Sequence, residues 1–385
     1  MTFLGGYLWR IIKMTKKFRF SIMVLISMTI LFSGCYNYKD INRVILVTSM
    51  LIDLDENNNI VIYTDTIKPY RNTNESSEKG MRIIFKGEGK SLFEAERNLN
   101  LSSSSTLNYT QNKAIIFSQK AAEAGLENYI DFLNRDQELL VRSFLFVYYG
   151  EIDRLMKLAS NDEEYLGAFL NQVVNKMQTS PRTINLNLND YLVTRDLGSG
   201  ITIMSALEVK KGVLKDNIEL VGGAVIDKEK LVDRMQISQG LSYNFLMNKV
   251  KRGTLEVTNP DDKKKIVTLE ILNGKTKTDI KVEKDKVELI KTMKIRASIG
   301  DIQGKMVVSE ENIKKLQENA ENNIKKYGSM LFEEFKGKDL DIFNVERELE
   351  MKYPNVKIDT PLKKAELKIY PEVVIEGSST IHNAK

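Results

Sequence analysis

The sequence predicts a multi-domain α+β fold, with three domains of mixed sheets and packed helices behind a lipid-anchored amino terminus. Its 385 residues exceed what one ordinary hydrophobic core accommodates. Hydrophobic residues make up 42% and charged residues 28%, a composition typical of folded globular chains. Strand and helix patterns are interleaved, but the first two strands are joined by a short turn. This favours α+β over a doubly wound parallel sheet.

The amino terminus has the pattern of a signal peptide. A basic stretch at residues 16–19 precedes an uncharged run at residues 20–34. The run is about 15 residues long, the length of a signal-peptide apolar region and short of the roughly 20 residues that span a bilayer. A lipoprotein signal peptide at residues 1–34 is therefore predicted. Translation is expected to start at Met14, which opens a more ordinary leader than Met1 does.

The uncharged run ends at the only cysteine of the chain. Ser33 and Gly34 directly precede Cys35, and small residues before a cysteine resemble the lipobox of bacterial lipoproteins. In such proteins the thiol receives a diacylglycerol, the leader is cut before the cysteine, and the new amino terminus is often acylated. Cys35 is the predicted lipidation site, and two fatty chains would hold the protein stably at the outer face of the cell membrane. The alternative is a plain membrane-anchored helix with an incidental cysteine.

A first α+β domain is predicted at residues 36–194. Its first two strands are separated by a short polar turn, which predicts a hairpin. Ser91 and Glu94 form a capping-box pattern, which predicts the start of a helix. The predicted strands cover residues 44–53, 60–67, 83–86, 114–117 and 144–149, and the predicted helices cover residues 91–99, 121–133 and 165–177.

A middle domain at residues 201–257 and a C-terminal α+β domain at residues 258–385 are predicted beyond a linker at residues 180–200. In the C-terminal domain, apolar residues recur every three or four positions from Ile313 to Phe335, which predicts a long amphipathic helix. The predicted strands cover residues 220–226, 231–235, 265–272, 278–282, 292–299 and 365–376, and the other helices cover residues 241–250 and 342–353.

The rare residues and the charge balance exclude several function classes. Trp9, Cys35 and His382 are each the only residue of their type. No disulfide forms within one chain, and a zinc site built mainly of His and Cys, which needs at least three such ligands, is excluded. Five of the 57 basic residues lie within residues 1–34, so 52 basic residues balance 52 acidic residues beyond it. This balance offers no broad basic surface for nucleic acid. No cofactor or metal is expected, and the ectodomain alone is expected to be a soluble monomer.

Three short motifs imitate functional sites. Alternating Asp and Asn at residues 53–59 imitate a calcium loop, but the required Gly and Glu are missing and a hairpin turn is predicted. The serine run at residues 102–105 has no nearby base and predicts a polar loop. The glycines at residues 198–200 and 222–223 lack the Lys-Ser/Thr of a phosphate loop, so they are predicted to lie in a linker and a strand.

Several further short motifs follow the lipobox in a fixed order. They are Gly89-Lys-Ser-Leu-Phe-Glu-Ala95, Leu133-Asn-Arg-Asp136, Leu220-Val-Gly-Gly-Ala-Val225, Val250-Lys-Arg-Gly253, Asp341-Ile-Phe343 and Lys352-Tyr-Pro354. Their order and spacing resemble the Ger(x)C family, the C subunits of spore germinant receptors, over almost all of the mature chain. The chain departs from the family pattern at Asn344, where Gly is common.

The resemblance implies a non-enzymatic lipoprotein on the outer face of the spore inner membrane. It implies assembly with two membrane-embedded subunits, A and B, in a receptor that responds to nutrients and triggers release of dipicolinate and cations. The family has no established catalytic residues, so none is assigned. One rival is a solute-binding lipoprotein of a transporter, which would have two α/β lobes around a cleft. A second rival is a surface hydrolase with paired carboxylates, although no motif singles out a pair.

Overall fold

The structure is a computed structural model that describes residues 16–32, 44–68, 81–135, 141–158, 165–176, 180–284 and 286–376. The chain forms two compact units, residues 1–44 and residues 45–385. In the first unit, helix α2 (Lys16–Phe32) carries exposed apolar side chains at its described positions. Among the described residues, no helix is both long and apolar enough to cross a membrane. The predicted lipidation site Cys35 lies outside the described residues.

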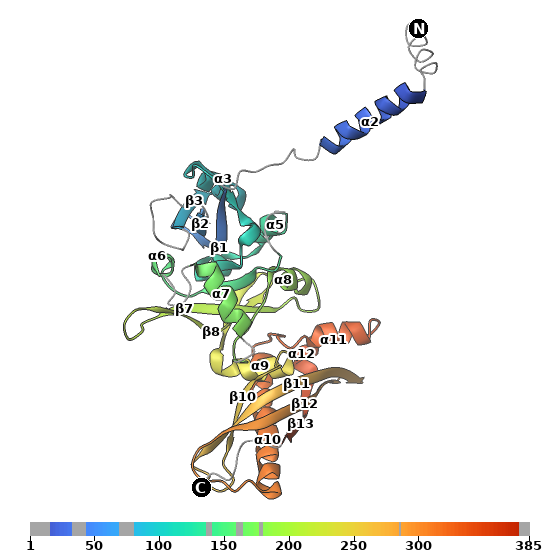
Figure 1. Ribbon diagram of the computed structural model, residues 1–385. Helices are drawn as coiled ribbons and strands as arrows, with labels where there is room; N and C mark the ends of the chain where they lie inside the picture. The colour runs from blue at the N-terminus through green and yellow to red at the C-terminus, as the bar shows by residue number, and fades with distance from the viewer. Residues whose placement is uncertain are drawn as a thin grey trace. The chain divides into compact units, whose positions relative to one another are not determined.

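The second unit contains two sheets, and the larger is mixed (Figure 1). Its strands are β1 (Val44–Leu54), β2 (Ile60–Lys68), β3 (Met81–Gly89), β4 (Thr106–Asn108), β5 (Ala114–Ser118), β6 (Phe144–Tyr148), β7 (Thr202–Lys210), β8 (Asn217–Asp227) and β9 (Lys230–Gln236). The order is β3-β2-β1-β5-β6-β7-β8-β9, with β4 beside β1. The central strands β1, β5, β6 and β7 are parallel, and the strands toward both edges are antiparallel.

Helices cover both faces of this sheet, which explains why β5 is buried at every position. On one face lie α3 (Leu92–Leu101), α4 (Gln119–Ala124), α5 (Glu127–Arg135) and α8 (Leu188–Thr194), and on the other α6 (Ile152–Lys157) and α7 (Leu166–Asn175). A short 3₁₀ turn, η2 (Tyr109–Gln111), follows β4. The two apolar faces of the central strands belong to separate core clusters, so the sheet forms the middle layer of three.

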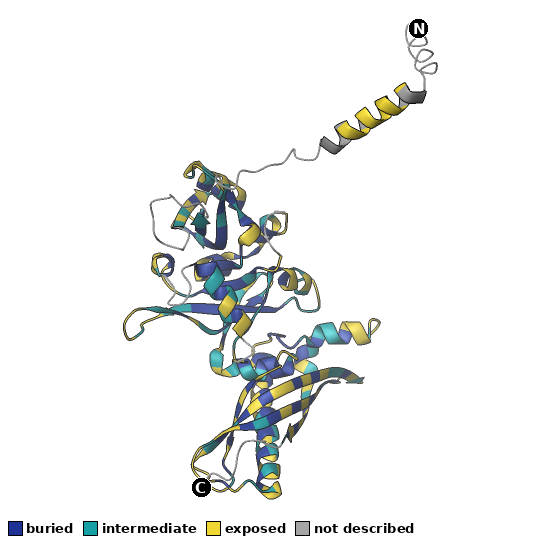
Figure 2. Cartoon of the chain, in the orientation of Figure 1, coloured by how far each residue is buried: buried dark blue, intermediate teal, exposed yellow. Residues whose placement is uncertain are grey.

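The smaller sheet packs one face against a single long helix. Its strands are β10 (Gly253–Thr258), β11 (Ile266–Glu283), β12 (Lys286–Ile302) and β13 (Ala365–Ile375), in that order. Figure 2 shows buried and exposed residues alternating along these strands, with α10 (Glu310–Gly337) covering the buried side. The short helices α11 (Val345–Lys352) and α12 (Pro361–Lys364) complete this core.

A short connecting region joins the two sheets. It comprises the 3₁₀ turn η4 (Ile237–Gln239) and helix α9 (Gly240–Leu246), which packs against α10. The core cluster of the smaller sheet also takes in Ile203 and Val225 of the larger one. The two sheets therefore share apolar packing within one compact unit.

The α+β fold class and most of the predicted elements are confirmed, with several differences. The predicted helix at residues 121–133 is two helices, α4 and α5, because Gly125 has φ 128°, outside the helical region. The two strands predicted within residues 265–282 are one strand, β11, because β12 continues the hydrogen-bond ladder across residues 273–277. The predicted linker at residues 180–200 contains α8, which packs into the core. Strands β4, β7 and β10 and helices α6 and α12 were not predicted.

The strands of the predicted middle domain pair with the larger sheet. Strand β7 lies parallel to β6, and β8 and β9 extend the sheet from it. The predicted boundaries at residues 194, 201 and 257 stay predictions, while the sheets themselves divide the described strands into one set before residue 237 and one set after residue 252.

Candidate functional site

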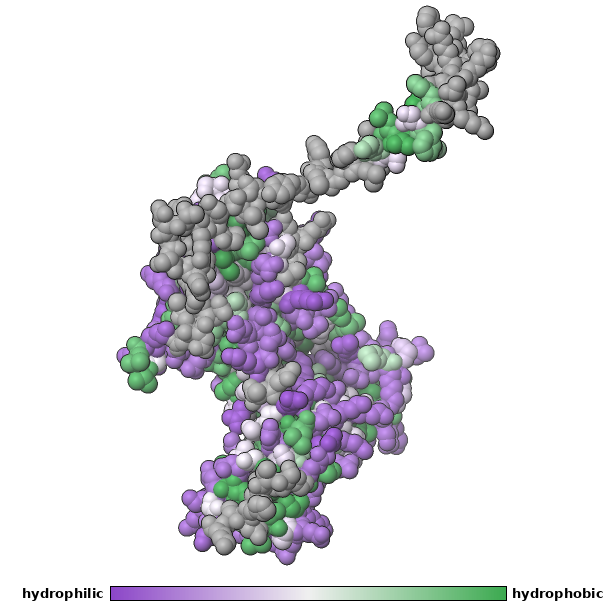
Figure 3. Space-filling view, in the orientation of Figure 1, coloured by the Kyte–Doolittle hydropathy of each residue, from purple (hydrophilic) through white to green (hydrophobic). Residues whose placement is uncertain are grey.

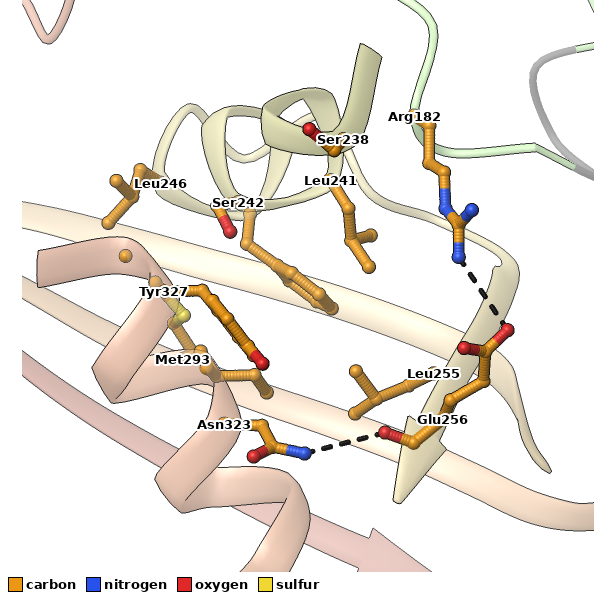
Figure 4. Close-up of a pocket in the computed structure, with 13 residues that line it drawn as sticks. Arg182, Ser238, Leu241, Ser242, Leu246, Leu255, Glu256, Met293, Asn323 and Tyr327 are labelled. Carbon is orange, nitrogen blue, oxygen red and sulfur yellow. Dashed lines mark hydrogen bonds and ion pairs between the residues drawn. The ribbon is translucent and has the colours of Figure 1, made fainter. Parts of the chain in front are cut away.

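A pocket of about 300 Å³ opens where α9, β10, β12 and α10 meet (Figure 4). Its floor is apolar and buried, formed by Phe245, Leu246, Leu255, Met293 and Ile324. These side chains come from all four elements, so the pocket exists only once the smaller sheet, α9 and α10 have packed together. An apolar floor of this size fits a small side chain or a small ligand.

The rim of the pocket is polar and partly exposed. Arg182 Nη2 lies 3.6 Å from Glu256 Oε1, and Asn323 Nδ2 donates a hydrogen bond to the Glu256 carbonyl at 3.4 Å. In Figure 4 these contacts reach Glu256 from two sides of the opening. The Arg182 and Glu256 side chains are about half exposed, so their ion pair contributes little to stability and is free to exchange partners. The rim therefore offers one positive and one negative group to a binding partner.

Helix α9 fixes the backbone that carries Arg182. Asn244 is buried, and its Nδ2 donates to the carbonyls of Pro181 and Thr183, both at 2.8 Å. Gly240, one turn earlier, faces the Arg182 carbonyl so closely that an added Cβ would lie 1.8 Å from it. Gly240 and Asn244 share one helix face because they are four residues apart. The four-residue spacing of Gly240 and Asn244 can be read from the sequence, but the segment that they contact, residues 181–183, cannot.

Two carboxylates are buried away from the pocket and serve helix starts. Asp65 Oδ1 pairs with Arg82 Nε at 2.5 Å, and its Oδ2 accepts the Leu166 backbone N–H that begins α7. Asp341 accepts the N–H groups of Val345 and Glu346 at 3.0 and 2.9 Å, at the start of α11. Burial raises the pKa of both carboxyls, and these same hydrogen bonds oppose the rise. These hydrogen bonds and the ion pair with Arg82 explain why the two carboxylates are buried.

A buried lysine lies inside the smaller sheet and was not predicted from the sequence. Lys291 of β12 is 2% exposed, and its Nζ donates to Thr278 Oγ1 on β11 at 2.9 Å. Burial lowers the pKa of Lys291 to about 8, although Glu348 and Asp341 oppose this. The sequence does contain a signal for this burial, because Lys291 occupies an apolar position in the alternating series at residues 287–299.

The motifs that imitate functional sites have structural roles. Asp55 closes the β1–β2 turn, accepting hydrogen bonds from the backbone of Asn57 and Asn59, so the predicted hairpin turn is confirmed. The serines at residues 102–105 form the predicted loop after α3. Gly198 and Gly222 lie in the predicted linker and in β8. Within the described ranges, no three His, Cys, Asp or Glu side chains gather as metal ligands would.

Two models of known protein families match this chain, and together they cover residues of both sheets. The spore germination protein N-terminal domain matches residues 37–208, and the spore germination B3/GerAC-like C-terminal domain matches residues 221–380. The chain belongs to the Ger(x)C family of spore germination proteins. The resemblance noted in the sequence is confirmed, and a role in spore germination follows from it.

Known relatives are distant but similar in length. Spore germination protein GerQC of Bacillus cereus is 21% identical over 320 residues, covering 83% of this chain and 87% of that protein. Spore germination protein KC of Bacillus subtilis (strain 168) is 20% identical over 348 residues, covering 81% and 84%. The crystal structure of the GerBC protein has the same fold, with a TM-score of 0.54 and 15% identity over 85% of this chain and 96% of that one.

Proposed function

We propose that the protein is a lipid-anchored, non-enzymatic subunit of a nutrient germinant receptor. It acts by contact with membrane-embedded A and B subunits on the outer face of the spore inner membrane. The observation that carries this proposal is the family match across both sheets, at residues 37–208 and 221–380. A folded unit that lies behind a lipobox-like leader suits a tethered contact protein.

The buried ionisable groups support contact rather than catalysis. A catalytic acid or base faces a cleft and a bound substrate. Asp65 and Asp341 instead bond to helix starts, and Lys291 bonds to a neighbouring strand. The charged groups that do line the pocket, Arg182 and Glu256, pair with each other at its rim. Asp65 and Asp341 therefore support folding, and Arg182 and Glu256 are placed for recognition.

A lipid tether strengthens weak contacts. Anchoring raises the effective concentration of the ectodomain beside its membrane partners, so individually weak surfaces suffice for assembly. The partly exposed rim of the pocket, with one group of each sign, provides such a surface.

Deletion of the gene tests the receptor proposal. Germination with one class of nutrient should be delayed or lost, because the receptor complex lacks a subunit, while a trigger that bypasses receptors still works. Affinity-tagged protein should co-purify with two polytopic membrane proteins. Normal germination with every nutrient, in a strain without a redundant receptor, would contradict the proposal.

The pocket also allows a test of one alternative function, that of a solute-binding lipoprotein. Its prediction is that a nutrient raises the melting temperature of wild-type protein but not of Ser242→Phe, which fills the pocket between α9 and α10. Ser242→Ala is the matched control and should respond as the wild type does. A transport defect in growing cells, together with this pattern, would favour the rival over the receptor subunit.

A further inference from the structure

The hairpin between β7 and β8 ends in two fully exposed aliphatic side chains. Val213 and Leu214 are 102% and 97% exposed, more than the other large apolar residues of the described chain. Figure 3 shows a green, apolar patch that projects from a mostly hydrophilic surface where Figure 1 draws the end of the β7–β8 hairpin. Single exposed apolar residues are ordinary on soluble proteins. A projecting pair with no covering side chain requires a more specific account.

The tip is carried by a two-stranded arm. Strand β7 pairs with β6 only through residues 205–207, and β9 pairs with β8 only from Gly222 onward. Residues 208–210 and 217–220 therefore pair with each other alone. The arm extends the tip past the edge of the neighbouring strands, where Val213 and Leu214 reach a surface before the rest of the sheet does.

Ion pairs brace this arm at its base and near its tip. Glu208 Oε1 lies 2.6 Å from Arg234 Nη1 of β9, and Glu208 also pairs with Lys210. Asp216 Oδ2 accepts from Arg154 Nε of α6 at 2.8 Å. Because the arm is ordered before it meets a partner, binding does not have to order it, which removes a usual cost of association.

The tip is positively charged. Lys211 and Lys215 flank the aliphatic pair, both are exposed, and neither forms an ion pair or hydrogen bond within the described residues. The nearest carboxylate in sequence, Asp216, is already neutralised by Arg154. Apolar side chains bordered by free lysines are complementary to an anionic lipid surface, where the side chains enter the acyl region and the ammonium groups stay at the headgroups.

We propose that residues 211–215 form a membrane-contact tip for anionic lipid. Val213 and Leu214 enter the lipid interface, and Lys211 and Lys215 bind the headgroup phosphates. The tip lies between the two stretches matched by the family, residues 37–208 and 221–380, so the family comparison does not account for it. The inference stands apart from receptor assembly, because the tip needs neither a partner subunit nor the lipid at Cys35.

The tether of the folded unit is short. The residues from Cys35 to Val44 span at most about 30 Å when extended, so a lipid on Cys35 would keep the folded unit near the bilayer. A second contact would restrict how the ectodomain turns about its tether.

Lipid fits the tip better than a protein does. A specific protein interface buries about 800 Å² on each partner. This tip is convex, and its apolar part is only two side chains. A fluid lipid surface closes around a small convex tip without a preformed complementary groove.

A fluorophore at the tip tests the proposal directly. Full-length protein with Cys35→Ser and Val213→Cys carries a single thiol, which is labelled with nitrobenzoxadiazole. Vesicles of phosphatidylcholine, alone or mixed with phosphatidylglycerol, are then titrated in. Emission should shift to the blue and rise several-fold with the anionic vesicles, and less with the neutral ones. Val213 is fully exposed, so this change leaves the fold intact.

A matched control separates insertion from general attraction of lysines. The same label at Lys263→Cys lies in an exposed lysine cluster, residues 263–265, that contains no aliphatic residue, and should not shift. Lys211→Glu combined with Lys215→Glu should abolish the response to phosphatidylglycerol, since each lysine near an anionic surface strengthens binding about fivefold, or about 1 kcal/mol. Unchanged emission at residue 213, or an equal shift at residue 263, overturns the proposal. A shift that appears only with the receptor partners present also overturns it and assigns the tip to a protein.

Discussion

Lys291 occupies a position where the alternation of β12 calls for an apolar residue. Val287, Leu289, Met293 and Ile295 on the same face are all buried in the core of the smaller sheet. Keeping an amine there is unfavourable, and the single hydrogen bond to Thr278 compensates only in part. This cost has a definite pH dependence. The folded-state pKa of about 8 lies below the ordinary value of 10.5, so between those values the unfolded chain binds more protons. The free energy of unfolding should therefore rise as the pH increases from about 8 to about 10.5.

Lys291→Met tests this at the residue scale. The free energy of unfolding near neutral pH should rise by about 1–3 kcal/mol, since a buried charge is replaced by an apolar chain of similar length. The rise with pH above about 8 should also disappear. Lys294→Met on the same strand is the control, because that side chain is 77% exposed, and it should change stability by less than about 0.5 kcal/mol. Denaturant titrations across the pH series provide the measurement. A loss of stability in Lys291→Met would show that the amine holds β11 and β12 together.

At the scale of elements, the segment between α8 and β7 meets the first turn of α11. Gly198 has φ 57°, and an added Cβ there would lie 2.7 Å from the Arg347 backbone nitrogen. Ser199 Oγ donates to the Asp341 carbonyl at 3.5 Å, and the Asp341 carboxylate accepts from the start of the same helix. This contact ties the chain that enters the larger sheet to a helix of the smaller one.

Gly198→Ala should weaken that contact. The left-handed backbone and the clash with Arg347 should together lower the free energy of unfolding by about 1–3 kcal/mol. Gly337→Ala is the opposite case, because the glycine lies in α10 with nothing within 4 Å of an added Cβ. It should be neutral or stabilise by up to about 1 kcal/mol. Equal effects of the two variants in urea titrations would refute the close approach of residues 197–200 to α11.

At the scale of the whole molecule, the proposed lipid at Cys35 would fix where the folded unit works. Cys35→Ala should leave the leader uncut and the protein without a diacylglycerol, whereas Ser33→Ala keeps a small residue and should be processed normally. Mass spectrometry of membrane-derived protein measures both. Trp9, the only tryptophan, precedes the expected start at Met14. Protein translated from Met14 should therefore lack tryptophan emission whether or not the leader is cut, so the mass of the amino-terminal peptide is the readout of processing. An unmodified Cys35 in the wild-type membrane fraction would be incompatible with the anchor.

The sequence by itself determined the local structure and the family. The apolar spacing from Ile313 to Phe335 predicted α10, and the polar turn before Ile60 predicted the β1–β2 hairpin. Such features depend on residues a few positions apart, so their periodicity is visible in the chain. The ordered motifs were sufficient for the Ger(x)C family, because they extend over both sheets.

Only the tertiary structure decided which strands share a sheet and which side chains share a site. A strand's alternation is the same whichever neighbour it pairs with, so the parallel pairing of β7 with β6 had no local signal. The pocket draws residues from α9, β10, β12 and α10, and the clamp of Asn244 on residues 181–183 joins positions about sixty residues apart. The sequence alone does not distinguish a buried lysine from an exposed one. Packing buries Lys291, whereas Lys211 and Lys215 stay exposed beside two exposed aliphatic residues. Burial and exposure are set by long-range packing, which local sequence patterns do not encode.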